Sequence, residues 1–500
     1  MFRRVSSVLA FVSVFAAAAP CRAADQWLEI KSPHFTVVSN AGQGAARNLA
    51  WQMEQIRSAL GAIWPWAHLD LDRPFIVFGA KDEHSMRTLA PRYWEEKGSM
   101  HPDSVWVEAA DRYYLAVRTD VKGEDYRNLN PYQTSYFSYV MLVLRQSVVK
   151  PLPFWLERGL AGVLSNTVVT DKQLLLGPPI PRYINQLRGD GPRLRVSELV
   201  SMTPQSPAVR GDDGAWRFDV EAWAFVHLLW FGDQGAHATA LAHFIDGVLK
   251  GTDAGTAFRE ALGAPEAWES PLSIYVSRSI FSFQQLQVDA TAKREAYPAR
   301  QLEVPESASL RALFHVAMNR PPDARAAIDE ARKAGPAPGS YEAEAELLDR
   351  EGKRDDAVAA YERAVDGGAA SAYAYRRLAS LLWRKSGNPS HDDMTQIASL
   401  LGKATGLNTR DDYAYAMLGE ARSILGEKDG LGLVRRAISL APQKADHHLT
   451  AARVLARERS FDEAQKEVEA AMALARTDDE RQRGRELVQW LQTARGRGGS

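Results

Sequence analysis

Three stretches of the N-terminal half carry side chains that could do chemistry, namely 136–142, 152–161 and 221–227. Ser138, Glu157 and His227 are side chains of the types that hydrolases use as nucleophile, acid and base. A zinc hydrolase would instead need two imidazoles one helical turn apart, a carboxylate base beside the first, and a third ligand. No histidine is followed by another four residues later, so the sequence lacks this histidine pair.

Other catalytic and cofactor motifs are missing as well. The chain contains no GxSxG nucleophile elbow. Gly430-Leu431-Gly432 follows no predicted strand and is interpreted as a turn between repeats, not as a dinucleotide loop. His227 lies in an apolar run, which favours a buried histidine that is hydrogen-bonded within the core.

The segments 152–161 and 136–142 resemble the core of gluzincin zinc peptidases, in particular their uncharacterised bacterial peptidase-MA-like branch. In that branch a helix with HExxH precedes a helix that opens like L-P-x-W-L-N-E-G-L-A-E-Y. Pro153-x-Trp155-Leu156 and Gly159-Leu160-Ala161 match that opening, and 221–227 and 32–35 also fit. The resemblance covers roughly 27–285 and implies a zincin-like α+β domain.

The same resemblance places the zinc-site positions on residues that cannot bind zinc. The first ligand falls on Phe137, the base on Ser138, the second ligand on Met141 and the third on Arg158. A phenyl ring has no lone pair to give, a thioether is a poor zinc ligand, and a guanidinium repels a cation. We therefore predict a degenerate zinc motif with no catalytic residue, no metal and no cofactor. Glu157, one place before Arg158, would point away from the contact between the two motif helices, because neighbouring residues on a helix face different directions.

Three residues are candidates for binding in the relict cleft, namely Glu157, Arg158 and His227. Arg158 is expected either to pair with a nearby acid, such as Glu157 or Asp171, or to hold an anionic group. The helix that contains Ser138 is expected to be the buried central helix of the domain, because 136–144 is apolar nearly all round.

Strand-like runs precede helical patterns in this part of the chain. Strands are predicted within 27–39, 74–78, 105–107 and 113–117, and helices over 42–64, 131–149, 153–165, 217–231 and 236–249. A mixed sheet followed by helices is an α+β plan. We predict a peptidase-MA-like domain over 24–288 and a linker over 289–306, which is polar and contains two prolines.

Small residues recur near the C-terminus at almost constant spacing. Ala331 and Ala364 are 33 residues apart, Ala404 and Ala437 are 33 apart, and Ala471 follows after 34. The tetratricopeptide repeat has a period of about 34, with small residues where its two helices touch. The step from Ala364 to Ala404 is 40, which indicates an insertion. We predict four to five tetratricopeptide-like hairpins, an all-α helical repeat over 307–495; an irregular helical bundle is the alternative.

The first 23 residues have the pattern of a secretory signal peptide. Arg3 and Arg4 precede an uncharged, mostly apolar run over 5–19, and small residues precede a cut after Ala23. Cys21 is the only cysteine, so the mature chain has no disulfide and no cysteine ligand. No later run reaches about 18 uninterrupted apolar residues, so no stable membrane insertion is expected after cleavage. An uncleaved anchor is the alternative.

Composition places the chain among globular proteins and argues against nucleic acid as a partner. It is 45% apolar and 25% charged, with a formal net charge of −1. Nucleic-acid binding usually requires a basic face, which this charge does not indicate. We predict an exported protein, periplasmic or secreted, that binds or scaffolds a protein or peptide through its repeats. The alternatives are a peptidase-like hydrolase with unrecognised chemistry in the N-terminal cleft, and a structural assembly component.

Overall fold

The N-terminal part of the chain is built on a six-stranded mixed sheet. The computed structural model describes residues 26–95, 101–122, 130–191, 193–368, 371–475 and 477–497, so the predicted signal peptide lies outside the described residues. The sheet order is β4-β5-β3-β2-β1-β9. The strands are β1 (Leu28–Lys31), β2 (Thr36–Ser39), β3 (Phe75–Ala80), β4 (Ser104–Glu108), β5 (Tyr113–Arg118) and β9 (Ala299–Gln301). β2, β3 and β5 run parallel, and the other pairs are antiparallel.

Ten helices belong to this part within the described residues. They are α1 (Gln43–Ile63), α2 (Glu83–Leu89), α3 (Gln133–Ser147), α4 (Phe154–Ser165), α5 (Pro181–Arg188), α6 (Val196–Ser201), α7 (Gly211–Phe231), α8 (Ala238–Leu249), α9 (Ala254–Leu262) and α10 (Glu269–Val276). A second, three-stranded sheet contains β6 (Val168–Val169), β7 (Gln173–Leu176) and β8 (Gln284–Gln287). The predicted α+β plan, a mixed sheet with helices, is therefore confirmed.

Helix α4 crosses α7 at very close range, and Gly159 makes this approach possible. A Cβ at Gly159 would lie 2.4 Å from Val226 Cγ2 and 2.6 Å from the carbonyl oxygen of Ala222. The glycine matched in the family resemblance thus has a packing reason of its own, because a side chain there would separate the two helices. The buried ring of Trp155 lies on the same helix and stacks on Phe244.

Strand β3 is buried on both faces, and the two faces belong to different cores. Phe75 and Val77 point into the core with α1, α3, α4 and α7. Ile76 and Phe78 point into a second core that continues into the first helices of the C-terminal array. This explains the uninterrupted apolar run at 74–78, since successive side chains of a strand face opposite sides.

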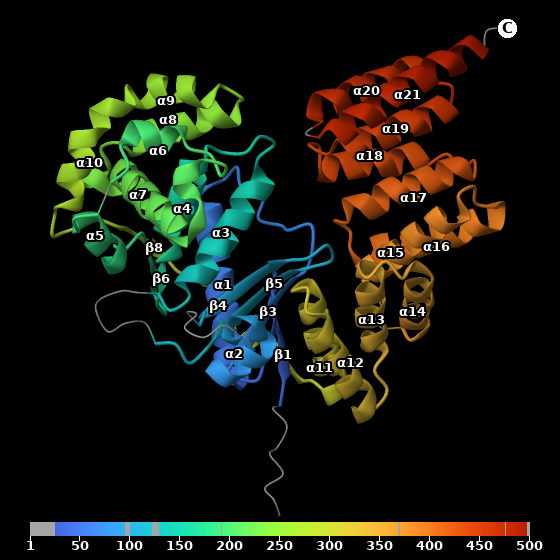
Figure 1. The fold of residues 1–500 in the computed structure, drawn as a ribbon, viewed down its shortest axis with the longest axis horizontal. Coiled ribbons are helices and arrows are strands. Elements are labelled where there is room, and N and C mark those ends of the chain that lie inside the picture. Colours follow the sequence, from blue (N-terminus) through green and yellow to red (C-terminus); the bar gives the residue numbers. More distant parts are fainter. Residues whose placement is uncertain are drawn as a thin grey trace, which may run out of the picture.

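The C-terminal part is an array of five helical hairpins closed by a final helix (Figure 1). The hairpins are α11 (Val304–Ala317) with α12 (Pro321–Ala334), α13 (Pro338–Arg350) with α14 (Arg354–Asp366), α15 (Ala372–Ser386) with α16 (His391–Leu407), α17 (Asp412–Ile424) with α18 (Gly430–Leu440), and α19 (Ala445–Arg457) with α20 (Phe461–Leu474); α21 (Asp478–Arg497) follows. The predicted helical-hairpin array is confirmed. All five recurring alanines are buried, and Gly430 opens α18, where its carbonyl oxygen would lie 2.5 Å from a Cβ at Gly419.

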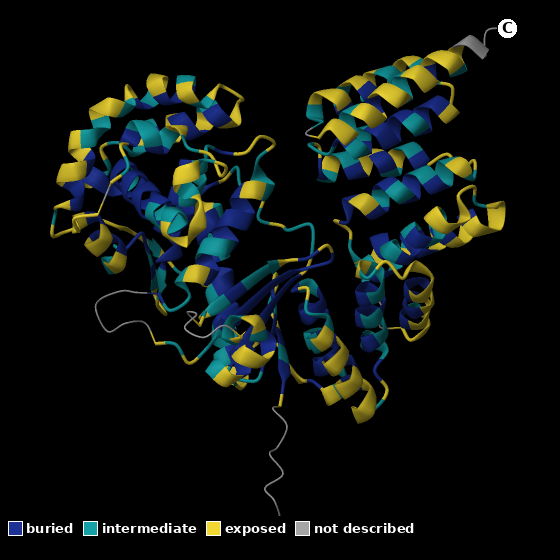
Figure 2. Ribbon diagram, in the orientation of Figure 1, coloured by how far each residue is buried: buried dark blue, intermediate teal, exposed yellow. Residues whose placement is uncertain are grey.

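The segment predicted as a linker, 289–306, is instead part of the folded N-terminal sheet. It contributes β9, which pairs with β1, and then the first residues of α11. Trp51 Nε1 donates to the carbonyl oxygen of Ala292 at 2.9 Å, and Gln55 Nε2 donates to that of Asp289 at 3.1 Å. Figure 2 shows that burial continues from the sheet into α11 and α13, so the two parts share a core.

Candidate functional site

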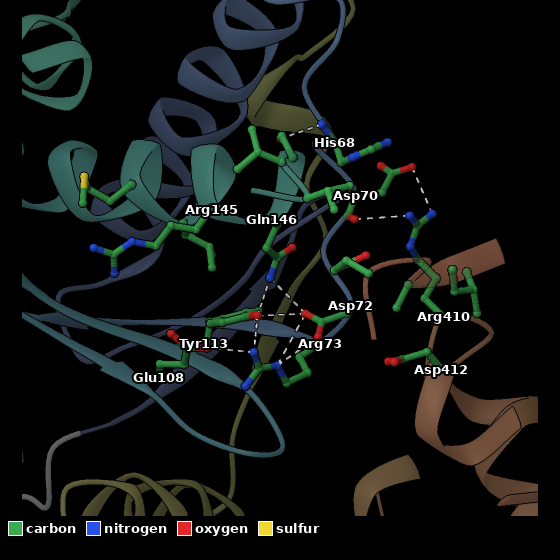
Figure 3. Close-up of a pocket in the computed structure, with 18 of the residues that line it drawn as sticks. His68, Asp70, Asp72, Arg73, Glu108, Tyr113, Arg145, Gln146, Arg410 and Asp412 are labelled. Atoms are coloured by element: carbon green, nitrogen blue, oxygen red, sulfur yellow. Dashed lines mark hydrogen bonds and ion pairs between the residues drawn. The ribbon is translucent and has the colours of Figure 1, made fainter. Parts of the chain in front are cut away.

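A large cavity lies between the N-terminal part and the repeat array. It holds about 580 Å³ and has two walls. One wall is formed by α3, the start of α4 and the loop before β3; the other is formed by Arg410, Asp412 and the segment 439–444 of the array. Figure 3 shows Arg410 of the array wall reaching toward Asp70 of the other wall.

All four positions of the degenerate zinc motif line this one cavity. Phe137 and Met141 lie one turn apart on α3, with Ser138 beside them, and Arg158 projects from α4. The Arg158 guanidinium lies over the Phe137 ring, 4.7 Å from its centroid, which is a cation–π contact. The structure therefore brings together the positions that the sequence pattern grouped, and two of them contact each other.

Arg158 pairs with an acid that the sequence did not single out. Its Nε donates to Asp219 Oδ1 of α7 at 2.6 Å, and a second nitrogen donates to the other carboxylate oxygen. Burial raises the pKa of Asp219, although Arg158 opposes that effect. Arg158 thus pairs with an acid, as expected, but the partners suggested for it, Glu157 and Asp171, are wrong, because each of these is bound to a different arginine.

Glu157 points away from Arg158, as expected for neighbours on a helix. Arg145 Nε of α3 donates to Glu157 Oε1 at 2.6 Å. Asp171 forms an ion pair with Arg294. Glu157 does not line the cavity, whereas Arg145 does, so the arginine is the member of this pair that faces the cleft.

His227, which was predicted as a cleft residue, does not line this cavity. It is fully buried in α7. Its Nδ1 lies 2.6 Å from the Tyr275 hydroxyl and its Nε2 lies 2.8 Å from the Gly177 carbonyl oxygen. These partners fit a neutral ring whose Nε2–H donates to Gly177 and whose Nδ1 accepts from Tyr275. Burial lowers the pKa of His227 to about 4, so the ring stays neutral at pH 7.

The side chains named for an alternative hydrolase do not form a catalytic arrangement. Ser138 Oγ donates to the carbonyl oxygen of Thr134 in its own helix at 3.0 Å. Within the described part of the chain, no hydrogen bond joins Ser138 to an imidazole or a carboxylate. Because His227 is buried elsewhere and Glu157 is paired, neither side chain has the geometry of a base for Ser138.

A hydrogen-bonded polar cluster forms the floor of the cavity (Figure 3). The Tyr113 hydroxyl donates to Asp72 Oδ1 at 2.8 Å, and Gln146 Nε2 donates to the same oxygen at 3.0 Å. Arg73 Nη2 donates to Glu108 Oε1 at 2.9 Å. Burial raises the pKa of Tyr113, so its hydroxyl stays protonated. Sequence reasoning missed this cluster, because its members come from four separate segments.

Two contacts at the mouth of the cavity join the walls directly. Arg410 Nη1 donates to Asp70 Oδ2 at 3.2 Å, and its Nη2 donates to the carbonyl oxygen of Asp70. Asn408 Nδ2 donates to the carbonyl oxygen of Asp72 at 3.1 Å. The loop between α16 and α17 therefore rests on the loop before β3.

The cavity continues along the array through shared lining residues. A second cavity of about 400 Å³ shares Asp412 and Lys444 with the first. It also shares Tyr413 with a cavity of about 410 Å³ on the array, which Trp383 and Met417 line as well. These neighbouring cavities, which share lining residues, are here called the interdomain groove.

Comparisons with known proteins find likeness to part of the chain. No family model matches it, and no curated protein matches it. A TPR protein named YrrB, described as having an unusual peptide-binding site, shares 16% identity over 36% of this chain and 91% of its own, with a TM-score of 0.31. MamA shares 22% identity over 32% and 91%, with a TM-score of 0.27. A thermophilic TPR protein of Thermus thermophilus shares 19% over 36% and 98%, with a TM-score of 0.28.

None of the described helices combines the length and the apolar character that crossing a bilayer requires.

Proposed function

We propose that this chain is an exported, non-catalytic relative of the peptidase-MA-like zinc peptidases that binds a protein segment in its interdomain groove. The observation that carries the proposal is the coincidence of the motif positions with the cavity between the two parts. Peptidases hold an extended chain across their zinc site, and the lost ligands would remove cleavage while leaving room for the chain. Export rests on the signal-peptide pattern of 1–23.

The contacts at the motif positions support the non-catalytic part of the proposal. Zinc hydrolysis requires nitrogen, sulfur or carboxylate donors around an open coordination position. Here the side chain at the third-ligand position is a guanidinium that covers Phe137 and is held by Asp219. The aromatic ring, the thioether of Met141 and the guanidinium form a surface suited to contact with a peptide side chain.

The lining of the groove supports a peptide as the bound molecule. Phe137, Met141 and Trp106 supply apolar surface, and Arg145 and Arg410 supply exposed donors at the edge. Sites of this kind bind extended chains by combining side-chain pockets with polar groups for the backbone. The helices of the array would extend that contact beyond the cavity, as helical repeats commonly do.

Photocrosslinking from both walls tests the proposal. A benzophenone amino acid would replace Ser138 on α3 in one variant and Gln443 on the array wall in another, because both line the cavity. The matched control is Ile280, which is 85% exposed and lies outside the cavity. We expect the same partner to be captured from both walls and not from Ile280.

Three results would contradict the proposal. Equal capture at Ile280 would show that the contact is unspecific. Capture of the same partners by a 24–300 fragment as by the full chain would show that the array is not part of the site. In addition, Met141→Trp should fill part of the cavity and reduce capture at Ser138, so unchanged capture would place the partner elsewhere.

One observation favours a second function, a structural role in an assembly. The second face of the N-terminal sheet packs against α11 and α13, so the N-terminal part caps the array as a terminal repeat would. In that case the groove variants should leave partner capture intact, whereas disruption of the shared core should abolish it.

A further inference from the structure

A cluster of three buried acids lies at the junction between the sheet and the repeat array. Asp111 comes from the turn between β4 and β5, and Glu342 and Glu346 lie one turn apart on α13. Their exposed fractions are 5%, 2% and 5%. One carboxylate oxygen of each acid lies within 4.8 Å of those of the other two. Carboxyl groups from both sides of the junction therefore share one small buried volume.

Glu342 and Asp111 have partners that favour their charged forms. Arg112 Nη2 donates to Glu342 Oε1 at 2.7 Å, and Arg112 Nη1 lies 3.2 Å from Asp111 Oδ2. Ser371 donates to both oxygens of Glu342, from its backbone nitrogen at 2.9 Å and from its hydroxyl at 2.6 Å. Hydrogen bonds to a carboxylate stabilise the ionised form. Glu342 therefore stays ionised, and Asp111 shares the same guanidinium.

Glu346 lacks partners of this kind. Within the described residues it forms no ion pair, and its Oε1 is buried without a hydrogen bond, as is the hydroxyl of Tyr361 on α14. Burial, and secondly the charges of Asp111 and Glu342, raise the pKa of Glu346. Burial also raises the pKa of Asp111, but Arg112 opposes that effect. A buried carboxylate without a partner is costly, so Glu346 is the acid of this cluster that best holds a proton.

The charges of the cluster balance when it holds one proton. Two guanidinium groups, those of Arg112 and Arg350, act on Asp111 and Glu346. Three carboxylates against two guanidinium groups leave one negative charge in excess. One proton removes that charge and turns one carboxylate into a hydrogen-bond donor.

The other titratable and charged neighbours do not change this count. Arg377 donates to both oxygens of Asp349, at 2.5 Å and 2.9 Å. Arg376 pairs with Asp411 at 2.9 Å. The tyrosines stay neutral because burial raises the pKa of each. These neighbours are Tyr114 from β5; Asp349 from α13; Tyr361 from α14; Tyr373, Arg376 and Arg377 from α15; and Asp411 from the loop before α17.

We propose that the junction folds with one proton bound by Glu346, and that loss of this proton as the pH rises loosens the attachment of the array to the sheet. With the proton, Glu346 can donate to a neighbouring carboxylate. Without it, a third negative charge lies beside Asp111 and Glu342 in a buried site, where like charges repel strongly. The proton exchanges with solvent through the second cavity of the interdomain groove, which Asp111 lines.

The direction of the effect follows from the number of protons that each state binds. In the unfolded chain a glutamate side chain ionises at about pH 4.3. The folded junction keeps its proton to a higher pH, because burial raises the pKa of Glu346. Between these two pKa values the folded state holds one more proton than the open state. The equilibrium constant for opening the junction should therefore rise about tenfold per pH unit in that range.

Hydrogen exchange of the mature full chain over a range from about pH 5 to about pH 8 tests this proton. The exchange rates of the amides in α13 and in the β4–β5 turn, divided by the intrinsic rate at each pH, give the opening constants. We expect these constants to rise with pH.

Matched variants assign the proton. Glu346→Gln supplies an uncharged group at nearly constant volume, so the rise should disappear. Both chains keep His227 and the other titrating groups, so the ratio of their opening constants isolates this proton. Glu344→Gln, two residues away on α13, is the control, because Glu344 pairs with Arg332 at 2.7 Å outside the cluster. It should keep the wild-type pH dependence.

A second variant keeps the test decisive if Glu346→Gln does not fold. Asp111→Asn removes one negative charge from the sheet side of the junction, so Glu346 should lose its proton more readily and the rise should end at a lower pH.

Three results would overturn the proposal. The first is a ratio of wild-type to Glu346→Gln opening constants that does not change with pH. The second is an Asp111→Asn variant with the wild-type pH dependence. The third, which needs no variant, is a wild-type rise that is absent from α13 and the β4–β5 turn.

Discussion

Replacement of Phe314 by alanine should loosen the sheet as well as the array, because this ring lies in the core that they share. Phe314 is fully buried on α11. Its ring centroid lies 5.1 Å from that of Phe78 on β3 and 5.5 Å from that of Tyr114 on β5. Phe314 is therefore part of the first repeat in sequence, but its side chain packs against the sheet.

The expected loss can be estimated from these contacts. A buried Phe→Ala substitution costs about 3–5 kcal/mol through lost burial and the cavity left behind. Each aromatic pair adds about 0.5–1.5 kcal/mol beyond burial, which places Phe314→Ala near the upper end of that range. Hydrogen exchange can show where stability is lost. In the variant, the free energy of opening measured at the β3 amides should fall by several kcal/mol.

A matched substitution within the array separates the shared core from general destabilisation. Ile397 on α16 is 1% exposed and lies in a core without sheet residues. Ile397→Ala should cost about 2–5 kcal/mol but leave the exchange of β3 unchanged. The reasoning is refuted if Phe314→Ala also leaves β3 unchanged, or if α11 and α12 in an isolated 303–500 fragment are protected as in the full chain.

Three other outcomes are expected. Ala364→Leu should overpack a fully buried helix contact and cost about 1–3 kcal/mol in urea unfolding, whereas Ala359→Leu, exposed on the same helix, should cost little. As the pH falls from about 6.5 to about 4, the unfolded chain should protonate at His227 while the folded chain does not, so the free energy of unfolding should fall by about 3 kcal/mol. His227→Gln should reduce this loss in pH-dependent urea titrations, whereas His391→Gln at an exposed position should not. Elemental analysis should find no stoichiometric zinc and assays no phenanthroline-sensitive proteolysis; about one zinc per chain kept through dialysis would show that the ligands lie elsewhere.

The periodic features of the structure could be predicted from the sequence because they depend on local spacing. The recurring alanines marked the touching faces of hairpins, and all five are buried. The strands and long helices predicted before residue 250 are present, as α4 over Phe154–Ser165 illustrates for the predicted 153–165, whereas the short elements α2, α5, α6, β6 and β7 were not predicted. The motif spacing likewise placed Phe137 and Met141 on one side of α3, since residues four apart share a face.

The long-range pairings could not be predicted, because a single sequence carries no signal for them. Asp219 lies 61 residues beyond Arg158, and Glu342 lies 230 residues beyond Arg112. The polar stretch 289–306 looked like a linker because a short edge strand exposes its side chains, as β9 does, and its pairing with β1 is made by the backbone. The apolar run at 74–78 predicts a strand, but nothing in it indicates that α11 would cover one of its faces.

The two attachments of the array to the N-terminal part differ greatly in strength, and this difference bears on the groove between them. At one end, Phe314 and its neighbours form a continuous core with the sheet. At the other, Arg410 and Asp70 are 44% and 54% exposed, and such ion pairs contribute about 0–1 kcal/mol. The array is thus fixed firmly at its first hairpins and held lightly near its fourth. Because the groove opens beside the weak contact, a bound segment that separates Arg410 from Asp70 would lose little free energy at that contact.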